Sequence, residues 1–130
     1  MYRILELNPQ LVPFSDNIDL RMNLYRNTKN RLLTAGQDLK DFANGHNFYG
    51  FHHVEGGWYY REWAPSADQL YLEGEFNNWN PTSHPMKRLD GENWELYLPG
   101  DDALWHGCKV KTVVDYHGSR TEHLPLYIRR

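Results

Sequence analysis

The segment Gly74–Pro81, which reads GEFNNWNP, holds the residue types best suited to binding a ligand. Trp79 lies between Asn78 and Asn80, and asparagine both favours turns and offers an amide that donates and accepts hydrogen bonds. A sugar ring has apolar C–H patches on its faces and hydroxyl groups around its edge. One indole beside several amides matches both features in a shallow site. The alternative is an asparagine-rich turn whose tryptophan packs onto the core.

The sequence contains no pattern typical of catalysis. Its seven histidines lack the His-x-x-x-His or Cys-x-x-Cys spacing that places metal ligands on one face, so we expect surface histidines, with no metal and no cofactor. Four carboxylates, Glu73, Glu75, Asp90 and Glu92, are of the type that hydrolyses glycosidic bonds, but nothing in the sequence indicates that any two of them converge. A glycine-rich phosphate loop is absent as well. We therefore expect no catalytic residues.

Composition and charge narrow the class of protein. Of the 130 residues, 40% are hydrophobic and 15% aromatic, so the core has to be built from few, large side chains. The net charge of -3 and the scattered basic residues argue against a nucleic-acid partner. The single cysteine, Cys108, cannot form an internal disulfide, and no signal peptide or stretch of ~20 apolar residues is present. These features predict a soluble, cytoplasmic protein without a membrane partner.

Residues 1–45 carry the pattern of a helical segment. Ser15 or Asp16 is expected to cap a helix whose apolar residues recur at helical spacing, and Gly36 is expected to end it. A second, short helix is expected to begin at an Asp38 cap. Helices this few cannot form a core of their own, so they must pack on another part of the protein.

Residues 46–130 change to the pattern of an all-β domain, with short aromatic-rich runs separated by turn residues. Seven strands are expected: Phe48–Val54, Trp58–Trp63, Gln69–Glu73, Met86–Leu89, Trp94–Leu98, Lys109–Asp115 and Leu124–Ile128. The last of these segments is either an edge strand or an extended exit from the domain. Glu55–Gly57 and Tyr116–Ser119 are expected to be hairpin turns. The predicted fold class is mainly β, an immunoglobulin-like β-sandwich preceded by a short N-terminal helical segment. Because the chain ends within an apolar stretch, we expect it to be truncated before a further domain.

Three blocks of sequence, in a specific order, resemble a known family. They are Glu62-Trp63-Ala64-Pro65, then Gly74–Pro81, then Trp94–Pro99. In this order they closely resemble the family-48 carbohydrate-binding module that precedes the barrel in glycogen- and starch-branching enzymes. The helical segment resembles the N-terminal segment of the eukaryotic-type branching enzymes, so the resemblance covers nearly the whole chain. The sandwich blocks alone are also similar to isoamylase-type debranching enzymes and to the glycogen-binding domain of AMP-activated kinase β subunits.

The resemblance implies the non-catalytic N-terminal region of a 1,4-alpha-glucan branching enzyme, which serves glycogen biosynthesis. Such an enzyme cuts an α-1,4-glucan and transfers the freed segment, using a TIM barrel that these 130 residues lack. The chain alone is therefore expected to be inactive. Its implied partners are α-1,4-glucan, as glycogen or malto-oligosaccharide, and the catalytic barrel of the same parent protein. A debranching-enzyme or kinase-type glycogen module and a purely structural interface domain remain as alternatives.

The resemblance also implies which residues contact the sugar. Trp63 and Pro65 match the oligosaccharide site of branching-enzyme modules, and Asn93 lies on its other side, where the family often has a lysine. Trp79 matches the first stacking tryptophan of the kinase-type domains, whereas their second tryptophan falls at Arg120. The expected carbohydrate-binding set is Trp63, Pro65, Trp79, Asn78, Asn80, Asn93 and Lys111, the last of these hydrogen-bonding hydroxyls from a strand.

Overall fold

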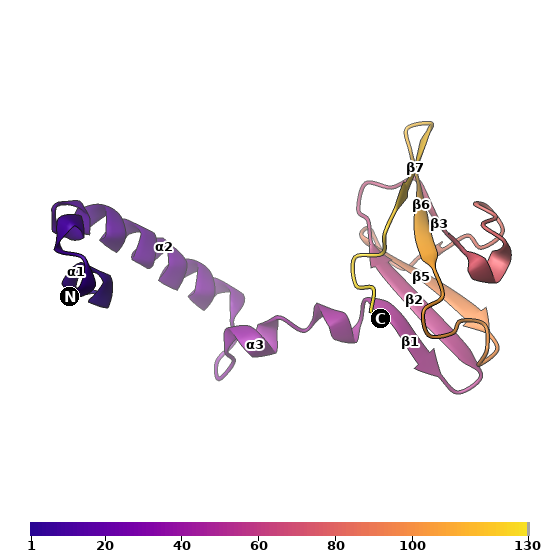
Figure 1. Ribbon diagram of the computed structural model, residues 1–130, viewed down its shortest axis with the longest axis horizontal. Helices are drawn as coiled ribbons and strands as arrows, with labels where there is room; N and C mark the ends of the chain where they lie inside the picture. Colours follow the sequence, from indigo (N-terminus) through magenta and orange to yellow (C-terminus); the bar gives the residue numbers. More distant parts are fainter. Residues whose placement is uncertain (130) are drawn as a thin grey trace. The chain divides into compact units, whose positions relative to one another are not determined.

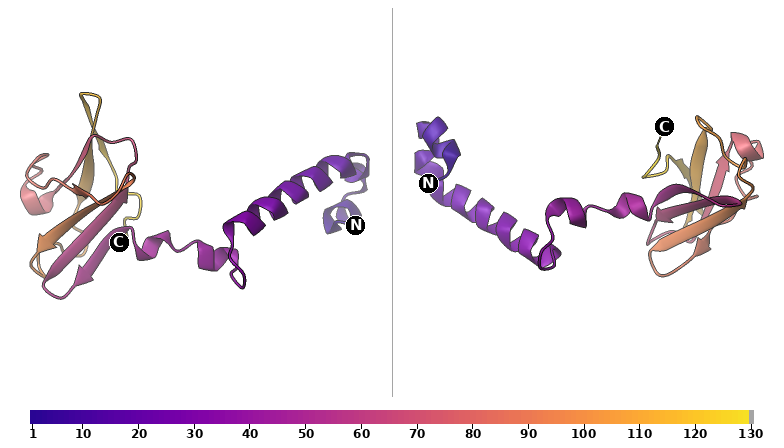
Figure 2. Two further views of the ribbon diagram at one scale, coloured as in Figure 1. Left: turned by 180° about the vertical axis from the view of Figure 1, so that it is seen from behind. Right: turned by 90° about the horizontal axis from the view of Figure 1, so that it is seen from below.

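The computed structural model describes residues 1–129, and the chain divides into two compact units, Met1–Asn44 and Gly45–Arg130 (Figure 1). The first unit is helical and the second is built from β-strands, which the further views also show (Figure 2). This confirms the predicted fold class, a mainly β protein with a helical segment in front. Among the helices of residues 1–129, none has both the length and the apolar character that crossing a bilayer requires.

The first unit consists of short helical elements around one longer helix. They are α1 (Arg3–Leu7), the 3₁₀ helix η1 (Pro9–Phe14), α2 (Ser15–Leu32) and α3 (Leu39–Phe42). Asp38 caps α3 as predicted, because its carboxylate accepts the Asp41 N–H at 2.9 Å. The Asp41 carboxylate accepts the Asp38 N–H at 2.9 Å in return. This reciprocal capping satisfies two backbone donors that a helix of four residues would otherwise leave open.

Both ends of α2 differ from the prediction. Neither Ser15 nor Asp16 caps the helix, because η1 runs directly into it and Phe14 takes the N-cap position. Gly36 does not end the helix, which stops at Leu32; Gly36 lies in the turn that follows, with a φ of +85°. No residue of α2 is buried. That agrees with the expectation that this helix needs another surface to cover its apolar residues.

The second unit contains seven strands in two antiparallel sheets. They are β1 (Gly50–Val54), β2 (Gly57–Trp63), β3 (Gln69–Gly74), β4 (Lys87–Arg88), β5 (Asn93–Pro99), β6 (Val110–Tyr116) and β7 (Ser119–His123), with two further 3₁₀ turns, η2 (Gly45–Asn47) and η3 (Glu75–Asn77). Sheet A has the order β1-β2-β5-β4, and sheet B has the order β3-β6-β7. Six of the seven expected strands are confirmed to within two residues at each end. Both expected hairpin turns, between β1 and β2 and between β6 and β7, are also confirmed.

Of the two interpretations of Leu124–Ile128, the edge strand is wrong, and the seventh strand lies earlier in the chain. Leu124–Ile128 is irregular, and the strand is β7, formed by the polar and exposed residues Ser119–His123. The turn before it decides this, because His117 and Gly118 both have a positive φ, at 46° and 78°. Two such residues make a tight hairpin turn that pairs Tyr116 with Ser119 and continues the ladder from there. Hydropathy favoured the later, apolar segment, but the turn geometry selects the polar one.

The core lies between the two sheets and is dominated by large side chains. Tyr60, Leu70 and Leu72 are fully buried, and Trp94 and Leu98 are nearly so. Since successive residues of a strand point to opposite faces, burying Tyr60 and Glu62 turns Arg61 and Trp63 of the same strand to the outer face of sheet A. The core therefore decides which tryptophan of β2 can meet a ligand.

The segment after β7 returns to the sandwich instead of leaving it. The backbone N–H of Leu126 donates to the buried carboxylate of Glu62 at 3.0 Å. The ring of Tyr127 stacks on that of Tyr49, with centroids 5.4 Å apart. Gly50 permits this approach, since a Cβ there would lie 2.6 Å from the Tyr127 carbonyl oxygen. The final segment is thus attached beside the start of β1.

Candidate functional site

The structure divides the seven expected sugar-binding residues into two groups. Trp63, Pro65 and Asn93 lie at one end of sheet A, where β2 ends and β5 begins. The other four lie along sheet B and the loop that follows β3: Asn78, Trp79, Asn80 and Lys111. We refer to the first group, with Asp90 and Glu92, as the Trp63 surface, and to the second, with Glu73 and Glu122, as the Trp79 surface.

Trp63 is held at the outer face of sheet A, with 46% of the residue exposed. In the strand register it stands opposite Asn93. Its indole N–H donates to the Glu92 carboxylate at 3.4 Å, and the next residue, Ala64, donates its N–H to the Glu92 carbonyl at 2.9 Å. Pro65 is exposed two residues further on. The ring is therefore oriented from one side and open on the other, which suits stacking against a ligand face.

The turn opposite Trp63 is organised by Asp90. One carboxylate oxygen accepts the backbone N–H groups of Glu92 and Asn93, both at 2.8 Å, and the other accepts the Asn93 amide at 3.0 Å. These backbone hydrogen bonds hold the pKa of Asp90 below its ordinary value. The carboxylate is therefore ionised at neutral pH and fixes Asn93 against the end of β2.

Tyr49 is a residue of this surface that the sequence reasoning missed. Its hydroxyl donates to the Asn93 side-chain oxygen at 2.6 Å. Burial raises the pKa of Tyr49, and the nearby carboxylates of Asp90 and Glu92 raise it further, so the hydroxyl remains a donor. No sequence pattern could have identified this contact, because Tyr49 and Asn93 are 44 residues apart. The Asn93 amide is thus used largely to hold the turn, which leaves Trp63 and Pro65 as the open contacts.

The loop after β3 is held by its first asparagine and not by those expected to bind. The Asn77 side-chain oxygen accepts the Gly74 N–H at 2.9 Å, and its amide donates to the carbonyls of Leu72 and Asn80 at 3.2 and 3.1 Å. Asn80 is also committed, since its side-chain oxygen accepts the Thr82 N–H at 3.1 Å. Within residues 1–129, the Asn78 side chain forms no hydrogen bond and is exposed.

Trp79 has an unusual backbone conformation. Asn78 and Trp79 have φ values of 53° and 57°, in the left-handed region that bulky residues rarely adopt. The loop hydrogen bonds of Asn77 hold both residues in this conformation, and the indole is 41% exposed. Trp79 therefore stands at the surface and does not pack into the core, in contrast to the alternative interpretation of an asparagine-rich turn.

Lys111 lies beside this indole, between two carboxylates. Its Nζ is 5.8 Å from the centroid of the Trp79 ring and 2.5 Å from a carboxylate oxygen of Glu122. Glu73 stands opposite Lys111 in the strand register and is buried. Burial raises the pKa of Glu73, and the Glu122 carboxylate raises it further, whereas Lys111 lowers it. The Lys111 ammonium group is thus already paired with Glu122, so fewer of its N–H donors are free to bind sugar hydroxyl groups.

The position that would carry a second stacking tryptophan is occupied by Arg120. Its guanidinium forms two hydrogen bonds with the Asp115 carboxylate, at 2.7 and 2.8 Å, and lies 5.3 Å from the centroid of the Tyr71 ring. A guanidinium held in this way does not replace an open indole face. The Trp79 surface accordingly offers one ring, with Asn78 beside it, and so provides less stacking area than a platform of two rings.

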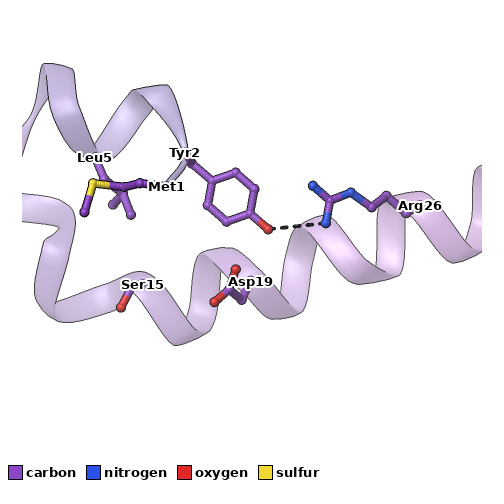
Figure 3. Close-up of a pocket in the computed structure, with 6 residues that line it drawn as sticks. All are labelled: Met1, Tyr2, Leu5, Ser15, Asp19 and Arg26. Atoms are coloured by element: carbon purple, nitrogen blue, oxygen red, sulfur yellow. Dashed lines mark hydrogen bonds between the residues drawn. The ribbon is translucent and has the colours of Figure 1, made fainter.

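The structure also contains two hollows away from these surfaces. A gap of about 600 Å³ in the first unit lies between α1 and α2, and in it the Arg26 guanidinium donates to the Tyr2 hydroxyl at 3.5 Å (Figure 3). A groove of about 690 Å³ in the second unit, which we call the apolar groove, is lined by the apolar residues Phe51, Trp58, Leu104, Trp105, Leu124 and Ile128 and by polar residues that include His106, Lys109 and Arg129. Trp105, Leu124 and Ile128 are exposed there. Neither hollow holds a residue of the expected sugar-binding set.

The arrangement suits binding better than catalysis. The Trp63 surface combines an open indole with the carboxylate oxygens of Asp90 and Glu92, which can accept hydrogen bonds from hydroxyl groups. Its negative charge disfavours phosphate ligands. Within the part of the chain that the structure describes, no group of three His, Cys, Asp or Glu residues could hold a metal ion. The chemistry available is stacking and hydrogen bonding to a neutral polyhydroxylated molecule.

Comparison with known proteins identifies a family for most of the second unit. A family model described as carbohydrate-binding module 48 (isoamylase N-terminal domain) matches residues 48–128. This range contains both tryptophan surfaces and the apolar groove except its last residue, Arg129.

Longer relatives match almost the whole chain. The 1,4-alpha-glucan-branching enzyme of Dictyostelium discoideum is 35% identical over 133 residues, which cover 98% of this chain and 20% of that protein. The enzyme of the same name from Felis catus is 38% identical over 117 residues, covering 86% of this chain and 17% of that protein. The 1,4-alpha-glucan-branching enzyme 2-2, chloroplastic/amyloplastic, of Arabidopsis thaliana is 32% identical over 131 residues, covering 98% and 16%. The chain thus spans at most about a fifth of the length of these curated relatives.

Proposed function

The chain belongs to the carbohydrate-binding module 48 family, and from this premise we propose that it binds α-1,4-glucan without catalysing a reaction. We propose further that it docks on the catalytic domain of a longer branching-type enzyme of glycogen biosynthesis, acting in the cytoplasm. The second proposal is supported by the similarity to branching enzymes, which are about five times as long. Binding at the Trp63 surface and docking through the apolar groove use different residues, so each proposal can be tested alone.

The observation that carries the sugar-binding proposal is the open and oriented indole of Trp63. Its N–H is directed to Glu92, while 46% of the residue remains exposed next to the exposed Pro65. A ring already held in one orientation loses little conformational entropy on binding, so stacking against a sugar face is favoured. The neighbouring carboxylate oxygens add acceptors for sugar hydroxyls.

The Trp79 surface is the secondary candidate for sugar binding. Its indole is exposed to a similar degree and is supported by a strained loop that keeps it outside the core. However, Lys111 is paired with Glu122, and Asn80 is used within the loop. We therefore propose the Trp63 surface as the main contact and the Trp79 surface as a weaker one.

The apolar groove supports the docking proposal. Exposed apolar side chains line it, with Leu124 70% and Trp105 50% exposed. Removing such apolar surface from water is favourable, so a partner that covers the groove is stabilised there. The groove lies between β1, residues 104–109 of the connection from β5 to β6, and the final segment, all of which belong to the second unit. Lys109 and Arg129 also line it, so it fits a protein surface that combines apolar and acidic side chains.

A titration with maltoheptaose tests the sugar-binding proposal. Isothermal calorimetry or amide shifts of the 130-residue chain should give a Kd of about 1 mM, the affinity of a few stacked rings and hydroxyl contacts. Trp63→Ala should remove most of this binding. Trp79→Ala, which deletes a similarly exposed indole on the loop after β3, should remove much less. The proposal fails if the unmodified chain binds no maltoheptaose at several millimolar sugar, and the order of the two surfaces is reversed if Trp79→Ala has the larger effect.

Co-elution tests the docking proposal. The partner is the Dictyostelium relative expressed without its matching residues, after circular dichroism has shown that it is folded. The 130-residue chain should co-elute with it on size-exclusion chromatography, and Trp105→Ala should reduce the complex while Trp79→Ala leaves it unchanged. Absence of a complex with the unmodified chain would contradict docking but would leave the sugar-binding result unaffected.

A further inference from the structure

The outer face of sheet A continues beyond the Trp63 surface along β2 and β5. Counting back from Trp63, the outward-facing residues of β2 are Arg61 and Tyr59, and their partners on β5 are Glu95 and Tyr97. We refer to these four residues, together with Phe48, as the tyrosine strip. Because the strip starts where the Trp63 surface ends, the two form one continuous face.

Tyr97 is fixed in place at the far end of this face. Its hydroxyl donates to the Gly56 carbonyl at 3.0 Å, and its ring centroid lies 5.0 Å from that of Tyr59. The ring lies against the backbone of Gly57, where a Cβ would come within 2.8 Å of its Cζ atom. Even so, Tyr97 is 44% exposed. One side of the ring is therefore supported by the hairpin while another side is open, as it is at Trp63.

The middle of the strip combines charge neutrality with unused hydrogen-bonding groups. The Arg61 Nε atom lies 2.7 Å from a Glu95 carboxylate oxygen, and both side chains are only about a quarter exposed, at 22% and 24%. The guanidinium lies 4.9 Å from the Phe48 ring centroid and 5.0 Å from that of Tyr59. Within residues 1–129, neither terminal nitrogen of Arg61 donates a hydrogen bond. These nitrogens can donate to a ligand without leaving Glu95 unpaired.

The order of groups along the face is an aromatic ring, a neutral pair with spare donors, and then aromatic rings again. An anionic ligand would gain little electrostatic attraction from this face, because the carboxylate of Glu95 already neutralises the charge of Arg61. An apolar protein surface would have to cover that ion pair at a desolvation cost. A neutral chain of sugar rings needs no charged partner, and its hydroxyl groups can hydrogen-bond to the ion pair while its apolar faces stack on the aromatic rings.

We propose that the tyrosine strip is a second sugar-contacting subsite, and that one α-glucan chain runs along sheet A from Trp63 to Tyr97. This inference rests on the proposed binding of glucan at the Trp63 surface. Trp63 and Tyr59 are four residues apart on one strand, a distance of about 13 Å. A short oligosaccharide at Trp63 therefore stays clear of Tyr97, and only a longer chain reaches it. The subsite makes affinity depend on chain length.

The test compares maltotriose with maltoheptaose on the full 130-residue chain. Maltoheptaose should shift the ring resonances of Tyr97 in NMR spectra, whereas maltotriose should shift those of Trp63 alone. Tyr97→Ala should weaken maltoheptaose binding about fivefold, within the range of one aromatic contact, and leave maltotriose binding unchanged. Tyr97→Phe keeps the ring but loses the hydrogen bond to Gly56, so it should retain most of the affinity and shows whether the ring itself matters.

Two outcomes would overturn the inference while leaving the proposed function intact. One is equal affinity of Tyr97→Ala and the unmodified chain for maltoheptaose, with Trp63→Ala still losing it. The other is an equal loss of affinity for maltotriose and maltoheptaose in Tyr97→Ala, while Tyr97→Phe binds both sugars as tightly as the unmodified chain does. That result would mean that the Tyr97 ring supports Trp63 and does not itself contact the sugar. If the unmodified chain binds neither sugar, the proposed function itself fails, and the subsite fails with it.

Discussion

The backbone N–H of Leu126 donates to the carboxylate of Glu62, across 64 residues of chain, at 3.0 Å. The same carboxylate accepts the Tyr60 hydroxyl at 2.7 Å and the Trp63 backbone N–H at 3.1 Å. Burial raises the pKa of Tyr60 well above its usual value, so its hydroxyl stays protonated and donates. One buried carboxylate thus joins the core, the final segment and the residue that carries the open indole.

Replacement of Glu62 tests this junction. Glu62→Ala leaves the Leu126 and Trp63 N–H groups without their acceptor, and we expect it to lower the free energy of unfolding by about 2–4 kcal/mol. Urea unfolding followed by tryptophan fluorescence measures the change. Glu55→Ala, at an exposed position of the β1–β2 turn, should change stability by less than about 0.5 kcal/mol. Similar small effects for both variants would show that the junction contributes little.

Gly50 is the second position where the final segment depends on a close contact. With a φ of +89° and the Tyr127 carbonyl 2.6 Å from a Cβ, Gly50→Ala should destabilise the protein by about 2–3 kcal/mol. It should also separate Tyr127 from Tyr49 and so loosen the Asn93 side chain. Thermal unfolding and the Tyr49 ring resonances report the two effects. Gly91→Ala is the matched control, because nothing lies within 4 Å of a Cβ there.

Asp90 offers a test of whether the turn positions the sugar contact. Asp90→Ala removes the acceptor of the Glu92 and Asn93 N–H groups, so Glu92 no longer holds the Trp63 indole as firmly. We expect maltoheptaose affinity to fall about fivefold, equivalent to about 1 kcal/mol, while the sandwich remains folded. Calorimetric titration beside a far-UV circular dichroism spectrum checks both statements. Unchanged affinity would mean that Trp63 needs no support from this turn.

The pH dependence of stability should carry the signature of Glu73. Its pKa is raised above the ordinary value of 4.5 chiefly by burial, so the protonated form is favoured by folding. A carboxyl of this kind contributes stability at low pH that is lost as the pH rises from about 4.5 through its folded pKa. Glu122 acts in the opposite sense, because pairing with Lys111 lowers its pKa and its contribution is lost as the pH falls.

Glu73→Gln separates the two contributions. The amide resembles the protonated carboxyl, so this variant should be more stable than the unmodified protein at pH 7. The gain should shrink as the pH falls through the raised folded pKa of Glu73 and should be nearly gone at a pH of about 4.5. Chemical unfolding at a series of pH values measures it, with Glu55→Gln as the same charge change on an exposed side chain. A stability gain that stays constant with pH would assign the effect to something other than the titration of Glu73.

Local patterns in the sequence were sufficient for much of the fold. Residue types favouring strands and turns placed six strands, and the Glu55–Gly57 turn joined β1 to β2 as expected. Asp38 was recognisable as a helix cap because capping acts over three residues. Trp63 and Trp79 were predicted as candidate contacts, and the structure exposes both.

Only the tertiary structure decided the features that depend on distant pairing. The polar β7 was missed although the turn before it was predicted, because its residues are all polar and exposed and only their pairing with β6 identifies them as a strand. Tyr49 and Glu62 could not be assigned roles because their partners lie 44 and 64 residues away. The tyrosine strip likewise exists only once β2 and β5 are paired. A sequence specifies which side chains a strand exposes, but it is the folded sheet that sets which exposed side chains become neighbours.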